Sequence, residues 1–411
     1  MRIRTRALGS LAGIALIIAS CSSAATPTPP TAPPATASPA PTTAPSASAA
    51  ATSAAPSATP APSVAQKPDL KIGVVTDIGT LDDKGYNEFS YKGAQDGATA
   101  IGVAGTVPSI VPKDASEYAA DIQSFVSQKF DVIVTVGFNM TTPTVAAAKA
   151  NPTIHFIGVD QSPVCVDPTG APDATFACKG DAKTLLPNYT SLYFAEDQAG
   201  YLAGIVAAYA DKGAANPTGV IGAIGGTTLC APCVRYIQGY TLGALSVNPA
   251  ISVKTAYVTH DFSNAAFNDP AGGKAFAQTF ISSNKPDVLF QVAGKTGNGV
   301  LEAACAAGIY GIGVDVDQWS SLGAPANACI ITSAEKHVES AVKQAIEGVA
   351  AGNLSAGDLL FNAANDGIGA SDFHDKASMF GPEVTTALQT ALAAMQAGTL
   401  KTCPTTGCGT P

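Results

Sequence analysis

From residue 68 onward, short runs rich in β-branched residues alternate with longer amphipathic stretches, and this alternation limits the fold more than any other feature. Parallel strands joined by helices that cover their sheet produce such a pattern. In the connecting stretches, Tyr118, Ile122 and Phe125 fall on one helical face. The predicted strands are 70–76, 131–136, 154–159, 219–224, 251–258, 287–293, 312–314 and 330–332. Their number predicts an α/β fold with two doubly wound sheets.

Acidic residues and glycines gather at the ends of these predicted strands. The positions at or just after a strand end are Asp77, Gly137, Asp160, Gly226, Gly294 and Asp315. Because crossovers between parallel strands are right-handed, the carboxyl ends of one sheet open on the same edge, where ligands bind. We therefore expect a ligand site at this edge. For Asp160, the cap of a following helix is the alternative role.

The N-terminal residues have the features of an export signal. Arg2, Arg4 and Arg6 precede an apolar stretch, 7–18, that is too short to span a bilayer. The sequence Ile-Ala-Ser-Cys that ends at Cys21 resembles a bacterial lipobox, in which the cysteine receives a diacylglyceryl group. We expect residues 1–20 to be a signal peptide and Cys21 to anchor the protein on the extracytoplasmic face of the cell membrane. The alternative is an ordinary signal peptide with an incidental cysteine.

Residues 21–67 are predicted to be a disordered tether that follows the lipidated cysteine. Between residues 22 and 66 the chain is almost entirely Ala, Pro, Ser and Thr and contains no charged residue. Such a segment cannot bury enough apolar surface to offset the entropy of ordering. Removal of the three signal arginines takes the formal net charge from −9 to −12, which argues against nucleic acid and anionic lipid as partners.

Nine cysteines occur in the chain, so eight remain after Cys21. In an exported protein we expect them to form disulfides, here between sequence neighbours, although the sequence does not fix the connectivity. The neighbours are Cys165 with Cys178, Cys230 with Cys233, Cys305 with Cys329, and Cys403 with Cys408. The Cys230-Ala231-Pro232-Cys233 stretch also fits a thiol oxidoreductase motif, because C-x-x-C lowers the pKa of one thiol. It does not, however, follow the first strand of a small βαβ domain.

The sequence contains no pattern that predicts catalysis or a cofactor. His155, His260, His337 and His374 lack the spacing of metal ligands, and no G-x-S-x-G occurs. The glycine-rich segment 294–299 lacks the spacing of a nucleotide-phosphate loop. We therefore predict a binding protein rather than an enzyme, with no catalytic residues, no metal and no cofactor.

Five segments of the folded region carry a resemblance to a known family. They read VTDIG with LDDKGYN (75–79 and 81–87), F with YLAG (194 and 201–204), QVAGKTGNGV (291–300), GVDVDQ (313–318) and TSAEK (332–336). In this order and spacing they resemble the basic membrane protein family of solute-binding lipoproteins, which includes the purine nucleoside receptor of spirochaetes.

This resemblance implies the type I periplasmic-binding-protein fold, in which two doubly wound lobes are joined by three hinge crossovers and close on a ligand. Lobe one would comprise residues 68–193 and 337–352. Lobe two would comprise residues 194–336 and 353–411. The implied partners are a small-molecule ligand and the permease of an ABC uptake transporter, with the protein as a monomer. The alternatives are a clamp that reports its ligand to a signalling partner and a binder of another small polar solute.

The resemblance also implies a purine nucleoside site. Its ligand-binding residues would be Asp77, Tyr86, Asn87, Phe267, Gly294, Asp315 and Lys336. Tyr86 and Phe267 would stack on the base from opposite lobes, and Asp77 would accept a hydrogen bond from a base nitrogen. Asp315 and Lys336 would hold the ribose hydroxyls through charge-assisted hydrogen bonds.

Three departures from the family pattern bear on this site. Tyr86 stands where phenylalanine is usual, so its hydroxyl needs a partner. Lys295 places a charge beside Gly294, the glycine that would let the backbone approach the sugar. Cys230 and Cys233 lie in a loop that is near the cleft mouth in relatives.

We expect the tether to contribute nothing to ligand binding, because its composition cannot form a packed surface. A chain that starts at Gln66 should therefore bind ligand as the full-length protein does. Calorimetry on the two proteins measures this, and a tenfold loss of affinity in the shorter chain would show that the tether is part of the site.

Overall fold

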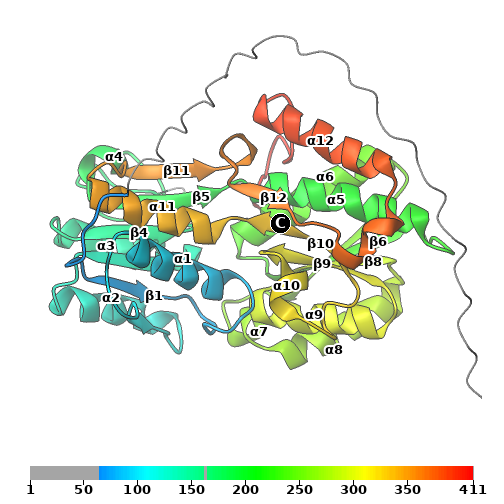
Figure 1. Ribbon diagram of the computed structural model, residues 1–411, viewed down its shortest axis with the longest axis horizontal. Helices are drawn as coiled ribbons and strands as arrows, with labels where there is room; N and C mark the ends of the chain where they lie inside the picture. The colour runs from blue at the N-terminus through cyan, green and yellow to red at the C-terminus, as the bar shows by residue number, and fades with distance from the viewer. Residues whose placement is uncertain (1–63, 162–163, 411) are drawn as a thin grey trace, which may run out of the picture. The chain divides into compact units, whose positions relative to one another are not determined.

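The computed structural model describes residues 64–161 and 164–410 (Figure 1). The predicted signal peptide, Cys21 and the tether before residue 64 lie outside the described residues. Within the described ranges, no helix is both long enough and apolar enough to cross a membrane. The fold of these residues is built on two six-stranded sheets.

The first sheet has the strand order β11-β5-β4-β3-β1-β2, and all its neighbouring strands pair in parallel. Its strands are β1 (Ile72–Val75), β2 (Ser109–Ile110), β3 (Val132–Val136), β4 (His155–Val159), β5 (Tyr189–Phe194) and β11 (Gly357–Phe361). Its helices are α1 (Tyr86–Ala100), α2 (Tyr118–Ser127), α3 (Thr141–Ala150), α4 (Ala182–Leu185) and α11 (Val338–Ala351). Successive β3 side chains point to opposite faces: Val132 and Val134 pack with α1 and α11, and Ile133 packs with α2 and α3.

The second sheet has the order β12-β10-β9-β8-β6-β7 and is parallel except for β12, which runs antiparallel to β10. Its strands are β6 (Val220–Thr227), β7 (Ser252–Thr259), β8 (Val288–Val292), β9 (Tyr310–Asp315), β10 (Ile330–Lys336) and β12 (Ile368–Ala370). One core packs against α5 (Glu196–Gly213), α6 (Ala231–Val247) and α12 (Pro382–Gln396). The other core packs against α8 (Pro270–Asn284) and α9 (Gly294–Ala306).

Short helical segments complete these two layers of connections. They are α7 (Asn264–Phe267), α10 (Gln318–Leu322) and the 3₁₀ segments η1 (Ala115–Glu117), η2 (Phe138–Met140), η3 (Ala363–Asn365) and η4 (His374–Met379). η2 follows the carboxyl end of β3, and α7 follows that of β7 after the segment 260–263, so their aromatic residues are carried to the edge of the sheets where the predicted site lies.

The chain passes between the two sheets three times. β5 leads into α5, β10 leads into α11, and β11 leads through η3 into β12. These crossings are those of the type I periplasmic-binding-protein fold that the sequence predicts. One segment differs from its expected place, because residues 357–361 were assigned to lobe two. They form β11, which pairs in parallel with β5 at the edge of the first sheet.

All eight predicted strands are present, but β2, β5, β11 and β12 were not predicted. β2 and β12 have two and three residues, which is too short for any period to show. β11 reads Gly-Asp-Leu-Leu-Phe and lacks β-branched residues. β5 is buried on nearly all of its length, so it lacks the alternation that marks a half-exposed strand.

Four glycines bring α5 and α6 into close contact. Gly200 and Gly204 of α5 lie against the backbone of α6, and Gly239 and Gly243 of α6 lie against the backbone of α5. A Cβ atom at Gly204 would lie 2.0 Å from the carbonyl oxygen of Tyr240. The two helices therefore approach to a distance that only glycine permits, and they are fixed against each other by their main chains.

Four disulfides join sequence neighbours. They are Cys165–Cys178, Cys230–Cys233, Cys305–Cys329 and Cys403–Cys408. The widest sequence separation is 24 residues, so each bond closes a short loop rather than joining the two sheets. Cys230–Cys233 differs from the others in its place, because it lies at the start of α6, next to the end of β6.

We expect Gly204→Ala to destabilise the folded protein, because the added methyl group would meet the carbonyl oxygen of Tyr240. The expected loss of unfolding free energy is about 1 to 3 kcal/mol. Gly213→Ala, at the end of the same helix, is the matched control, since a Cβ atom there meets nothing within 4 Å. Denaturant unfolding followed by circular dichroism compares them. Equal stability of the two variants would contradict the main-chain contact.

Candidate functional site

A cavity with about 600 Å³ of empty space, part of it open to solvent, is lined by residues that follow strands of both sheets. Asp77 and Asp160 follow β1 and β4 of the first sheet, and Asp315 and Lys336 end β9 and β10 of the second. All the predicted ligand-binding residues line this one cavity: Asp77, Tyr86, Asn87, Phe267, Gly294, Asp315 and Lys336. Their individual roles toward a ligand stay predictions.

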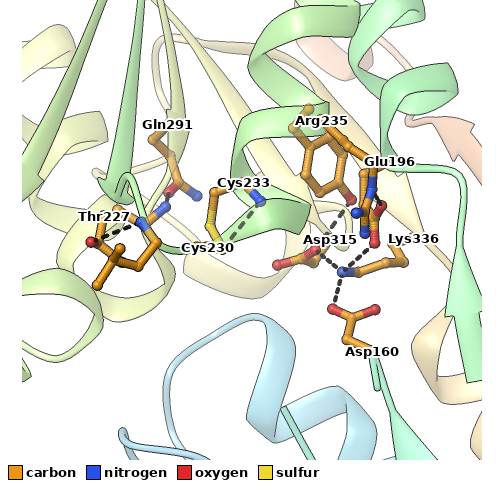
Figure 2. The surroundings of a disulfide bond; sticks show 12 residues. Asp160, Glu196, Thr227, Cys230, Cys233, Arg235, Gln291, Asp315 and Lys336 are labelled. Carbon is orange, nitrogen blue, oxygen red and sulfur yellow. Dashed lines mark hydrogen bonds and ion pairs between the residues drawn. A yellow bond between two sulfur atoms is a disulfide. The ribbon is translucent and has the colours of Figure 1, made fainter. Parts of the chain in front are cut away.

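The ammonium group of Lys336 lies among three carboxylates in the cavity wall (Figure 2). Its Nζ is 2.6 Å from Asp160 Oδ2, 3.5 Å from Asp315 Oδ1 and 3.7 Å from Glu196 Oε1. The lysine is only 3% exposed. Asp160 comes from the first sheet and Asp315 from the second, so this lysine, at the end of a hinge strand, connects the strand ends of both.

Two residues of α6 hold the carboxylates of this group in place, and Figure 2 labels one of them, Arg235. Arg235 Nε donates a hydrogen bond of 2.7 Å to Glu196 Oε2, and the Tyr236 hydroxyl donates one of 3.2 Å to Asp315 Oδ1. Tyr236 also presents its ring face to the lysine, with its ring centroid 5.6 Å from Nζ. The ring of Tyr86 is closer, at 5.0 Å. Cation–π attraction therefore adds to the ion pairs in holding the buried charge.

The two aspartates of the group have an unusual backbone conformation. Asp160 has φ of 60° and Asp315 has φ of 65°, in the left-handed region that aspartate tolerates better than most residues. Such conformations persist where surrounding contacts hold them, and they cluster at functional sites. The side chain of Asp160 lines the cavity and pairs with Lys336.

Burial and ion pairing set the charges of this group. Burial raises the pKa of Asp160 to about 6 and also raises the pKa of Asp315, and in both cases Lys336 opposes the shift. Burial works against the charge of Lys336, but Asp160, Asp315 and Glu196 raise its pKa above the usual value. The proton therefore stays on the lysine. The second oxygen of Asp160, Oδ1, is buried without a hydrogen-bond partner among the described residues, so it is available to accept one from a ligand.

Asp77, after β1 of the first sheet, is a buried carboxylate outside the group around Lys336. Its Oδ1 accepts hydrogen bonds from the Tyr118 hydroxyl and from the backbone N–H of Ile78, the latter at 2.6 Å. Burial raises its pKa to about 6 although both bonds favour the ionised form. Gly137 makes room for it, because a Cβ atom there would lie 2.2 Å from Asp77 Oδ2.

Gly226 makes room for an aromatic side chain in the cavity wall, as Gly137 does for Asp77. A Cβ atom at Gly226 would lie 2.5 Å from Cε1 of the Phe267 ring. Gly294 adopts φ of +52°, and a Cβ atom there would lie 3.3 Å from the backbone oxygen of Phe267. Two strand-end glycines therefore leave the space in which α7 places this ring. Phe138, which the sequence did not indicate, lines the cavity as well.

The start of α1 brings two further residues to the cavity. The carboxylate of Asp83 accepts hydrogen bonds from the N–H groups of Gly85, Asn87 and Glu88, so it caps the helix. This fixes Asn87, whose buried Oδ1 has no partner among the described residues. The Tyr86 hydroxyl, the departure from the family pattern, donates a hydrogen bond of 3.1 Å to the carbonyl oxygen of Val159. The extra hydroxyl is therefore satisfied within the protein.

Hydrogen bonds also join the loop after β1 to helices of the second sheet. Lys295 Nζ lies 2.7 Å from Asp82 Oδ1, which neutralises the charge that the sequence placed beside Gly294. Asn298 Nδ2 donates to the backbone oxygen of Asp83 at 2.8 Å, and Ser321 Oγ donates to that of Lys84 at 2.7 Å. These bonds connect the loop after β1 to α9 and α10.

Sequence reasoning did not find Glu196, Arg235 and Tyr236. They stand on helices, away from the strand ends that topology marks, and no short motif contains them. One signal was present: Arg235 is the only charged residue in α6. A single arginine in such a helix needs a buried acidic partner.

The described residues contain no group of three or more His, Cys, Asp or Glu side chains that could hold a metal ion. The site instead offers carboxylate and amide oxygens as acceptors, two buried cations and aromatic faces. Such groups suit a small polar molecule with an aromatic part.

Comparison with known proteins agrees with this geometry. Residues 70–390 match the model of the Bmp family, described as ABC transporter substrate-binding protein PnrA-like. The ABC transporter nucleoside-binding protein BmpA of Lactococcus lactis subsp. cremoris is 30% identical over 318 residues, which cover 74% of this chain and 81% of that protein. Basic membrane protein A of Borreliella burgdorferi is 29% identical over 273 residues, covering 65% of this chain and 68% of that protein.

Solved structures show the same fold. An ABC transporter solute-binding protein from Aeropyrum pernix K1 superimposes with a TM-score of 0.67 at 22% identity, over 81% of this chain and 92% of that one. The family match spans most of the chain and almost all of the fold described above, and its members are binding proteins rather than enzymes. The chain therefore belongs to the Bmp family of PnrA-like ABC transporter substrate-binding proteins.

Proposed function

We propose that this protein binds a purine nucleoside in the cavity and delivers it to the permease of an ABC uptake transporter. The observation that carries the proposal is that one cavity is lined by aromatic faces, by buried carboxylates and by the unpartnered oxygens of Asn87 and Asp160. The name of the Lactococcus relative, a nucleoside-binding protein, supports the same ligand class.

The aromatic residues form the part of the site that suits a base. Tyr86 stands on α1 beside the first sheet, and Phe267 stands on α7 beside the second. A flat base between them would gain about 1 to 3 kcal/mol from each stacking contact. Asp77 offers a carboxylate to an N–H group of the base, and the unpartnered Oδ1 of Asn87 offers a second acceptor.

The carboxylates around Lys336 form the part that suits ribose. Ribose hydroxyls are donors as well as acceptors, and ionised carboxylates can only accept. Asp315 and the free Oδ1 of Asp160 would each take one hydroxyl proton. Lys336 keeps both carboxylates ionised and in position, so its own contribution is mainly to orient them. Asp160 thus joins the binding residues that the sequence indicated.

The balance of charges in the site favours an uncharged ligand. Two buried cations, Lys336 and Arg235, face a larger number of carboxylates in and around the cavity: Asp77, Asp83, Asp160, Glu196 and Asp315. A phosphate group on the ligand would meet an excess of like charge, which works against its binding. A nucleoside is uncharged and avoids this repulsion, whereas a nucleotide carries the phosphate charge.

The N-terminal signals complete the proposal. Residues 1–20 would direct export, and lipidation of Cys21 would hold the mature protein at the extracytoplasmic face of the cell membrane. The Ala/Pro/Ser/Thr tether would then let a monomeric binding domain reach the permease.

Substitutions should separate sugar contacts from base contacts. We expect Asp315→Ala to weaken nucleoside binding by about 2 to 4 kcal/mol, because it removes a charged acceptor and leaves a hydroxyl without its partner. This corresponds to a dissociation constant raised by about 30-fold to 1000-fold. Phe267→Ala should weaken a nucleoside and its free base alike, whereas Asp315→Ala should affect the base much less. Calorimetry with inosine and hypoxanthine measures both.

Glu302→Ala is the control for these variants, because Glu302 is an exposed carboxylate of α9 whose ion pair among the described residues is with the surface residue Lys274. Circular dichroism should show all variants folded. The proposal fails if the wild-type protein binds no purine nucleoside tighter than about 1 mM, a free energy of only about −4 kcal/mol. It also fails if Asp315→Ala binds inosine as the wild type does.

Binding and folding should respond to pH in opposite directions through Asp77. Its folded pKa of about 6 is raised by burial from the ordinary value of 3.8. Nucleoside affinity should therefore fall as the pH is lowered from 7 to 5, because the acceptor becomes protonated. The contribution of Asp77 to stability is present at low pH and lost as the pH rises through about 6, since the folded state holds the proton more tightly.

Asp77→Asn tests both parts, because it cannot ionise. The variant should lose part of the pH dependence of affinity in calorimetry between pH 5 and pH 7. Its unfolding free energy relative to the wild type should increase over the same range. A variant whose affinity and relative stability keep the wild-type pH profile would rule out ionisation of Asp77 as the cause.

A further inference from the structure

One disulfide lies in the wall of the ligand cavity. Cys230, Pro232 and Cys233 all line it, although the two cysteines are only 3% and 6% exposed. Figure 2 draws the bond at the start of α6, between Thr227 at the end of β6 and the group around Lys336 and Asp315. The sulfur atoms therefore face the same space as the residues proposed to bind the nucleoside.

The same disulfide fixes the first turn of α6. Cys230 is the N-cap of the helix, and its Sγ accepts a hydrogen bond of 3.1 Å from the N–H of Cys233. The N–H of Cys230 in turn donates to the carbonyl oxygen of Thr227, so the turn from β6 into α6 is tight. A free pair of cysteines would lack the covalent link that closes this turn.

The residues that hold the buried carboxylates follow within one turn of Cys233. Arg235 binds Glu196, and Tyr236 binds Asp315. Any movement of the first turn of α6 is therefore passed to the acceptors proposed for ribose. The disulfide has two connections to the ligand: its sulfur atoms form part of the wall, and its helix positions the carboxylates.

We propose that the Cys230–Cys233 disulfide is a specificity-determining part of the ligand site and that the site binds tightly only when this bond is oxidised. The inference rests on the proposed function. The sulfur pair supplies an apolar, polarisable wall for the flat part of the ligand. Reduction replaces this wall with two thiols that no longer share a fixed geometry, and it releases the first turn of α6.

The chemistry of the change is a thiol–disulfide exchange with a small dithiol such as dithiothreitol. The dithiol gives two electrons and two protons, the bond between the sulfurs of Cys230 and Cys233 breaks, and each sulfur gains one hydrogen. The dithiol leaves as its cyclic disulfide. Because both sulfurs are buried in the cavity wall, a bound ligand would block the approach of the dithiol.

Ligand protection tests this contact in the wild-type protein. Inosine binding to the oxidised protein is measured first by calorimetry. The protein is then exposed to dithiothreitol for timed intervals with and without saturating inosine, and alkylated peptides are quantified by mass spectrometry. Cys305–Cys329 is the internal control, because it joins the end of α9 to the start of β10 at the opposite edge of the same sheet.

We expect inosine to slow reduction of Cys230–Cys233 by about tenfold more than it slows reduction of Cys305–Cys329. A general gain in stability would slow the reduction of both disulfides alike. Only a local contact between ligand and disulfide would make the two degrees of protection differ. Selective reduction should also weaken inosine binding by about tenfold, because it releases the first turn of α6 and the carboxylates that this helix holds. Equal protection of the two disulfides, with unchanged affinity after reduction, would overturn the inference and leave the proposed function intact.

A pair of substitutions gives the same test without a reductant. The double variant Cys230→Ala and Cys233→Ala should bind inosine about tenfold more weakly and should no longer respond to dithiothreitol. The matched double variant Cys305→Ala and Cys329→Ala should keep wild-type affinity, and its affinity should still fall on treatment with dithiothreitol. If the oxidised wild-type protein binds no nucleoside at all, the proposed function fails first and this inference fails with it.

Discussion

The structure depends on one buried ammonium group. A lysine that is removed from water is unfavourable unless several partners surround it, and Lys336 has three carboxylates and three aromatic rings. These partners come from strand ends and helices of both sheets. The charge is therefore held at the end of β10 by groups that both sheets contribute. A site for a polar ligand results from the same requirement, because carboxylates gathered around one cation keep oxygens that the protein does not use.

Much of this fold could be predicted from the sequence because long β-branched runs and regular strand spacing mark central parallel strands. The prediction was weakest at sheet edges. β11 carries no β-branched residue and belongs to the first sheet although it follows most of the second in the chain. Its place is decided by pairing with β5, a contact between residues far apart in sequence. Local pattern contains no information about such a contact, which explains why residues 357–361 were assigned to the other lobe.

The residues of the site likewise fall into those that the sequence could predict and those that it could not. Asp77, Asp160, Gly294 and Asp315 could be predicted because topology places strand ends together. The family resemblance added Tyr86, Asn87, Phe267 and Lys336, which no periodicity would have marked. Glu196, Arg235 and Tyr236 required the structure, because their role exists only when α5 and α6 pack on the strand that carries Lys336. The unused oxygen of Asp160 also became visible only once its other oxygen was seen to be paired.

The contact between α5 and α6 has a consequence for how this chain can diverge. Where two side chains touch, a change in one can be compensated by a change in the other. At Gly204 and Gly243 the partner is a main-chain carbonyl, which no substitution in the opposite helix can shorten or remove. The glycines can therefore change only if both helices shift together, and such a shift would carry Glu196 and Arg235 with it. These two glycine positions are thus tied, through the backbone, to the residues that hold the site together.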